Sequence, residues 1–144
     1  MKTLEKVDWD PAFSVDIPEI DELQKKMFAL FNALIDLKDK GADTKDCTNM
    51  ISEINEYCKF YFSKEEEYLK REGYPDFESH IREHRQFVKS TISLRREVAD
   101  TMDNMTYEVI DELREWLIAH IKNSDSLYVP FLRIKKYVKE SSSK

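Results

Sequence analysis

The sequence predicts an all-α protein: an antiparallel up-down four-helix bundle with an N-terminal arm and a short C-terminal helix. Three observations support this fold class. The 144 residues include only 2 Gly and 4 Pro, too few for a glycine-rich nucleotide-binding fold or a many-turned β-sandwich. Apolar residues recur at spacings of three and four along four long segments, which places them on one helix face. Short connections then make the helices antiparallel neighbours in a single domain, residues 1–144.

Each segment carries its own start and stop signals. Residues 1–18 form an irregular arm that Pro11 and Pro18 interrupt. Pro18 also suits the first turn of a helix, while Gly41 and Gly73 suit helix ends. The predicted helices span, in chain order, residues 18–40, 44–72, 76–101 and 106–123, followed by a short C-terminal helix over 127–140 and a frayed tail over 141–144.

Charge and cysteine usage exclude several classes of protein. The net charge is -6, and the densest basic stretch, Lys135 to Lys139, is too short for a nucleic-acid-binding face. No apolar run approaches the ~20 residues of a membrane span, and the first residues contain no signal-peptide core. Cys47 and Cys58 belong to no CxxC pattern, which indicates free thiols. We therefore expect a cytoplasmic protein without nucleic-acid or membrane partners; the sequence indicates no protein partner.

Polar residues interrupt the apolar faces that should form the core. His80 and His84 stand at i and i+4, so their Cβ atoms lie roughly 5–6 Å apart on one face. Glu65 also falls on an apolar face. Burying its carboxylate would cost several kcal/mol unless it is paired or bound to metal. Imidazoles and carboxylates without thiolates favour iron or manganese. The candidate site comprises Gln24, Tyr61, Glu65, His80, His84, His120 and Asp125. A hydrogen-bonded polar core without metal is the alternative.

Two further expectations concern side-chain orientation. The fourth helix is predicted to face the core through Val109, Leu113, Trp116 and His120, which are spaced by three and four. Glu66 and Glu67 adjoin Glu65 but lie off the apolar face, so both are expected to be solvated.

Several elements, taken in order, resemble bacterial hemerythrins. They are Trp9 followed by Ile20-Asp21, then Phe62-Ser63-Lys64-Glu65-Glu66, Gly73-Tyr74-Pro75, His80-x-x-x-His84, and the stretch from Trp116 through His120 to Asp125. The resemblance extends from about Trp9 to Leu132. It implies a four-helix bundle that holds a non-haem di-iron centre and binds dioxygen reversibly. In that family five histidines and two bridging carboxylates hold the two irons.

This sequence departs from the family pattern at Gln24 and Tyr61, which stand where two of the five histidines are expected. The resemblance implies that His80, His84 and His120 serve one iron, with Glu65 and Asp125 as the bridging carboxylates. Three interpretations follow. The second metal is lost; or Tyr61 phenolate and Gln24 carbonyl bind it, which would favour ferric iron; or these two side chains hydrogen-bond the carboxylates and fill its place.

The function that follows is a hemerythrin-like protein with an altered centre of one or two non-haem iron ions. It would bind or sense dioxygen, another small diatomic ligand, or iron. Two alternatives remain: an iron enzyme with oxidase, peroxidase or nitric-oxide chemistry, and a metal-free interaction bundle. Whether the protein is an enzyme is left open. Because histidine must be neutral to bind metal, affinity should fall below about pH 6.

Overall fold

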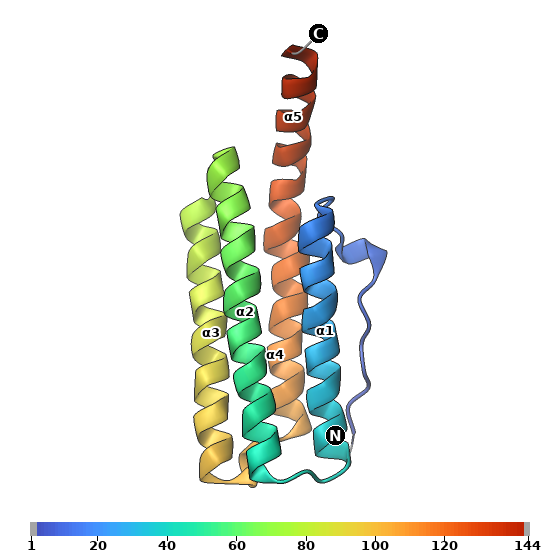
Figure 1. Cartoon of the computed structure of the whole chain (residues 1–144), viewed down its shortest axis with the longest axis vertical. Helices are drawn as coiled ribbons and strands as arrows, with labels where there is room; N and C mark the ends of the chain where they lie inside the picture. Colours follow the sequence, from blue (N-terminus) through green and yellow to red (C-terminus); the bar gives the residue numbers. More distant parts are fainter. Residues whose placement is uncertain (1–2, 143–144) are drawn as a thin grey trace.

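A computed structural model of the chain describes residues 3–142. Within that range the regular elements are all helical, which confirms the predicted fold class (Figure 1). Two 3-10 turns, Pro11–Phe13 and Met102–Asn104, accompany the longer helices. The helices are α1 Pro18–Asp39, α2 Thr44–Glu72, α3 Phe77–Asp100, α4 Tyr107–His120 and α5 Ser126–Ser142.

The ends of α1, α2 and α3 lie within a residue of their predicted positions because local signals define them. Asp43 caps α2 by accepting a hydrogen bond from the amide of Asp46 at 2.9 Å. Gly73 ends that helix in the left-handed conformation, at φ 72°, which glycine adopts without steric cost. Thr106 caps α4 by accepting from the amide of Val109 at 3.1 Å.

The four main helices form one bundle, in which α1 and α3 each pack against both α2 and α4. Figure 1 shows the four rods side by side, with the N-terminal arm running along the outside of α1. Asn32 on α1 holds this arm, since its side chain bonds both the amide and the carbonyl of Val7, at 3.1 and 3.2 Å. Arg114 on α4 holds it too, by donating to the carbonyl of Glu5 at 2.6 Å. The arm is therefore irregular, as predicted, but firmly attached.

The prediction of which α4 residues face the core was wrong: the most buried residues lie one position further along the chain. Ile110 and Leu117 are fully buried, whereas Val109, Leu113 and Trp116 are only partly buried. Apolar residues occupy both sets of positions, so hydrophobic periodicity alone does not distinguish them. The helix settles with Arg114 turned inward to reach the arm, and His120 remains buried as predicted.

The C-terminal helix also differs from its prediction. The five residues Ile121–Asp125 form a π-helical turn that joins α4 to α5 without a break. Figure 1 shows α4 and α5 as one long rod that extends beyond the rest of the bundle. Ser141 and Ser142, expected in a frayed tail, belong to the last turn of α5; residues 143–144 lie outside the described part. None of the described helices is long and apolar enough to cross a membrane.

Candidate metal centre

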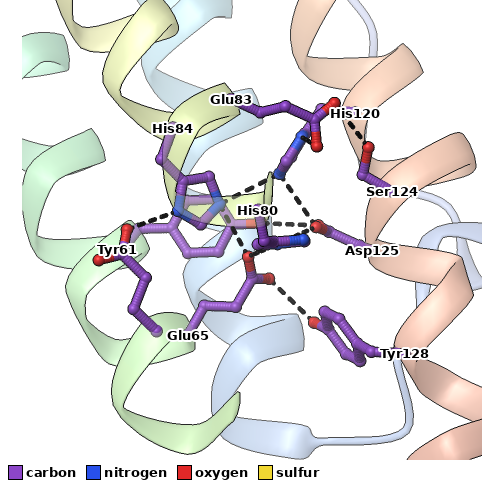
Figure 2. Close-up of polar contacts among 10 residues, drawn as sticks. Tyr61, Glu65, His80, Glu83, His84, His120, Ser124, Asp125 and Tyr128 are labelled. Carbon is purple, nitrogen blue, oxygen red and sulfur yellow. Dashed lines mark hydrogen bonds and ion pairs between the residues drawn. The ribbon is translucent and has the colours of Figure 1, made fainter. Parts of the chain in front are cut away.

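Five of the seven predicted site residues meet at one point in the bundle core (Figure 2). Glu65 comes from α2, His80 and His84 from α3, His120 from the end of α4, and Asp125 from the π-helical turn. Each side chain is at most 3% exposed. Each offers one ligand atom, and these atoms all lie within 4.8 Å of one another.

The spacing of the five atoms fits donors that share one cation. Oε1 of Glu65 lies 2.7 Å from Nε2 of His80 and 3.0 Å from Nε2 of His84. Oδ1 of Asp125 lies 3.0 Å from Nε2 of both His80 and His120. The Nε2 atoms of His84 and His120 are 3.1 Å apart. Two ligands at right angles around an ion, with bonds of about 2.1 Å, lie about 3.0 Å from each other.

Asp125 gives an independent test of this fit. Its Oδ1 atom is buried and makes no hydrogen bond, although two histidine nitrogens lie 3.0 Å away. A buried carboxylate oxygen without a hydrogen bond is costly. Coordination of a metal ion would satisfy it, so the residues present fit a bound cation.

The π-helical turn brings His120 and Asp125 together. In a regular α-helix, two positions five residues apart point about 140° away from each other. A π-helical turn has i to i+5 periodicity, so residues with that separation lie on one side. The widened turn therefore aligns Asp125 with His120, and both side chains face His80 on α3.

A carboxylate on the outer side of His84 orients its ring, and a second lies near His120. Oε2 of Glu66 lies 2.7 Å from Nδ1 of His84, and the Glu66 side chain is only 27% exposed. The expectation that Glu66 is solvated was wrong, because its long side chain reaches back across α2 to α3. Glu83 lies 3.6 Å from Nδ1 of His120, too far for a hydrogen bond, and that nitrogen has no hydrogen-bond partner; Glu83 accepts a hydrogen bond from Ser124 at 2.8 Å instead. A partner such as Glu66 directs Nε2 toward a metal and increases its basicity.

Aromatic rings further restrict the same two histidines. Phe62 stacks on His84 with ring centroids 3.9 Å apart and an interplanar angle of 4°. Trp116 stacks on His120 at 5.0 Å and 9°. These contacts limit ring rotation, so the two Nε2 atoms are held in place before any metal binds.

Tyrosine hydroxyls cap the outer oxygens of both carboxylates (Figure 2). Tyr128, fully buried on α5, donates to Oε2 of Glu65 at 2.9 Å. Tyr61 on α2 makes a longer contact of 3.5 Å with Oδ2 of Asp125. Burial and the charges of Glu65 and Asp125 raise the pKa of Tyr61 well above its ordinary value.

Protons bind strongly to the donor set. Burial alone would lower the pKa of His80, but the close contacts with the Asp125 and Glu65 carboxylates outweigh it and raise that pKa to about 10. The pKa of His84 is also raised, since Glu65 and Glu66 outweigh its burial. Burial would raise the pKa of Glu65, but the two histidines hold it well below its usual range. A metal must displace these protons.

Comparison with known proteins shows the origin of this site. Residues 15–132 match the family model of the hemerythrin HHE cation binding domain. The chain belongs to the hemerythrin family. A bacteriohemerythrin from Clostridium acetobutylicum is 31% identical over 125 residues, which cover 84% of this chain and 97% of that protein. A myohemerythrin from Theromyzon tessulatum is 31% identical over 124 residues, covering 86% and 92% respectively.

A solved structure supports the same relationship. The crystal structure of a wild-type hemerythrin superposes with a TM-score of 0.79 at 25% identity, and the match covers 88% of this chain and 97% of that one. The bundle described above is therefore the hemerythrin fold. Within it, the predicted Tyr61 on α2 contacts Asp125 of the five-residue cluster, whereas the predicted Gln24 on α1 is fully buried and bonded to Trp9.

Sequence reasoning missed several residues around this hemerythrin-family centre. The position of Tyr128 could have been inferred, because it follows Asp125 by three residues and such residues share a helix face. The π-helical turn that orients both residues is not apparent from the sequence.

Glu83 adjoins His84 on α3, but its contact with His120 on α4 depends on helix packing; the sequence singles out Trp9 only through the family resemblance. Trp9 lies in the arm, and its indole donates to Oε1 of Gln24 at 2.8 Å.

Proposed function

We propose that this hemerythrin-family chain binds non-haem iron in its core through His80, His84, His120, Glu65 and Asp125. The observation that carries the proposal is the convergence of five buried donor atoms within 4.8 Å of one another. The match to a cation-binding family over residues 15–132 supports it.

The donor chemistry suits iron. Imidazole nitrogens and carboxylate oxygens without a thiolate are ligands that iron accepts and that structural zinc sites rarely use alone. The two carboxylates balance the charge of one divalent ion, so the buried site becomes neutral when it is filled. Five protein donors around an octahedral ion leave one position open, and bound iron can offer that position to a small ligand.

The burial of the donor atoms favours a diatomic ligand such as dioxygen. A hollow of about 130 Å³ lies against His120 and is lined also by Glu83, Trp116 and Ser124. A wider groove of about 350 Å³ lies against Phe62, Glu66 and His84. The ligand atoms themselves are buried behind these residues. We therefore propose binding or sensing of a small ligand, in preference to turnover of a large organic substrate.

We also propose that the protein works in the cytoplasm and does not bind nucleic acid. Cys47 and Cys58 are both free and buried, as expected in a reducing compartment. The net charge of -6 disfavours association with a polyanion. Disulfide-free protein recovered from the cytosolic fraction would support the compartment.

Reconstitution with ferrous iron under anaerobic conditions tests the metal proposal. We expect the wild-type chain to retain iron after desalting and its optical spectrum to change reversibly on aeration and degassing. His84→Ala should lose the iron, whereas Gln86→Ala, an exposed position on the same helix, should keep it. A wild-type chain that retains no iron would contradict the proposal and favour the metal-free bundle. Continuous dioxygen consumption with a reductant would favour the enzyme.

A further inference from the structure

The hemerythrin resemblance implies two irons, but the residues on one side of this centre do not fit a second ion. We propose that the centre holds one metal ion, and that Tyr61, Gln24 and Trp9 form a polar plug in place of the second. This inference rests on the proposed iron-binding function. Of the interpretations that the sequence left open, this one has a single bound metal. Tyr61 and Gln24 then lie near the metal without binding it.

Glu65 and Asp125 each direct a single carboxylate oxygen toward the histidines, as expected for ligands of one ion. A carboxylate that bridges two ions through both of its oxygens offers one oxygen to each. Glu65 directs Oε1 to the three-histidine cluster, while its Oε2 accepts a hydrogen bond from Tyr128. Asp125 directs Oδ1 to the same cluster, while its Oδ2 faces the Tyr61 hydroxyl at 3.5 Å. In both residues the second oxygen is covered by a tyrosine.

Trp9 determines what Gln24 presents to the core. An indole nitrogen can only donate a hydrogen bond, so the Gln24 atom that lies 2.8 Å from it is the carbonyl oxygen. The amide nitrogen therefore points away from Trp9. This nitrogen is buried and has no hydrogen-bond partner, and an amide NH₂ does not bind a cation. Trp9 therefore occupies the carbonyl oxygen of Gln24, which could bind a metal, and leaves the amide NH₂, which cannot.

The number of imidazole donors gives a third argument. Among residues 3–142, Glu65 and Asp125 are the only buried carboxylates. The resemblance implies that two carboxylates serve two irons only together with two further histidines on the α1–α2 side. Here a second ion on that side would meet the neutral side chains of Tyr61 and Gln24, both fully buried. All three histidines of the chain already belong to the five-residue cluster, so no imidazole is left for a second ion.

Metal stoichiometry with electron paramagnetic resonance tests the proposal on the full chain. We expect one iron per chain at saturation and, after oxidation, an isolated high-spin ferric signal that accounts for all the iron. Two irons per chain, or a ferric form without this signal because two ions are magnetically coupled, would overturn the inference and leave iron binding intact. Retention of no iron would instead overturn the proposed function, and the inference with it.

Two variants separate the plug from a ligand role. Tyr61→Phe should keep one iron and an unchanged optical spectrum. Loss of a phenolate-to-iron charge-transfer band in this variant would show Tyr61 to be a ligand and overturn the plug. The double variant Q24E/Y61H keeps an acceptor for Trp9 and adds an anionic donor and an imidazole. We expect it to approach two irons per chain; a folded double variant that still binds one would refute the assignment of Tyr61 and Gln24 as the plug.

Discussion

The hydroxyl of Tyr128 donates a 2.9 Å hydrogen bond to Oε2 of Glu65, and this contact links α5 to α2 inside the bundle. Both side chains are essentially inaccessible to solvent. The bond leaves only Oε1 of Glu65 to face His80 and His84. The C-terminal helix is therefore part of the centre, although it contributes no member of the five-residue donor set.

Replacing Tyr128 by Phe should destabilise the metal-free protein by about 1.5–3 kcal/mol, because the buried Glu65 carboxylate loses a charge-assisted hydrogen bond. Urea unfolding followed by circular dichroism measures the change. Tyr137→Phe is the matched control, since Tyr137 lies on the same helix and is 71% exposed. Equal stability of the two variants would show that the Tyr128 contact contributes little.

Removing the Glu66 carboxylate should lower iron affinity by about 10- to 100-fold, because Glu66 orients the His84 ring through Nδ1. Glu66→Ala tests this in a competition titration against a chelator. Glu67→Ala provides the control, since the neighbouring side chain is 68% exposed and faces Lys64. If both variants bound iron as tightly as wild type, the Glu66 contact would not orient the ligand.

Iron affinity should keep increasing with pH, even at pH values well above those at which ordinary histidines lose their protons. A histidine pKa near 6.5 predicts loss of affinity only below about pH 6, but the pKa of His80 is raised to about 10. Each proton that the metal displaces makes the apparent affinity change about tenfold per pH unit below that pKa. Chelator competition at pH 6.5, 7.5 and 8.5 would measure the slope; a flat profile would contradict a displaced proton.

The metal-free protein should respond to pH in the opposite sense. A group whose pKa is higher in the folded state stabilises the fold below its unfolded pKa, here 6.5, and this stabilisation disappears as pH rises through about 10. The melting temperature of the metal-free chain should therefore fall between pH 6.5 and pH 10. His80→Gln should reduce this fall, since it removes the titrating group.

Gly73→Ala should destabilise the protein by about 1–2 kcal/mol, because residue 73 sits in the left-handed region at φ 72°. A Cβ atom at this position would meet no other part of the protein within 4 Å, so the cost comes from the local backbone conformation and not from a clash with neighbouring residues. Urea unfolding measures it. Glu53→Ala, at an exposed interior position of the same helix, should change stability far less. An unchanged midpoint for the Gly73 variant would contradict the role of the glycine.

Hydrophobic periodicity predicted much of the fold and of the candidate site. It located the helices within a few residues and placed His80, His84, His120 and Glu65 on inner faces, where the structure finds them. It failed where two faces were equally apolar, as on α4. It also failed for Glu66, because a long side chain one position off the inner face can still reach a neighbouring helix.

The sequence by itself indicated the helices, through local spacing along the chain, and the candidate donors, through that spacing together with the family resemblance. Only the tertiary structure decided how the donors are used. The π-helical turn aligns Asp125 with His120, against the periodicity of an α-helix. Long-range packing brings Tyr128 to Glu65 and the arm residue Trp9 to Gln24. Such contacts depend on which helix faces meet, and no local pattern encodes them.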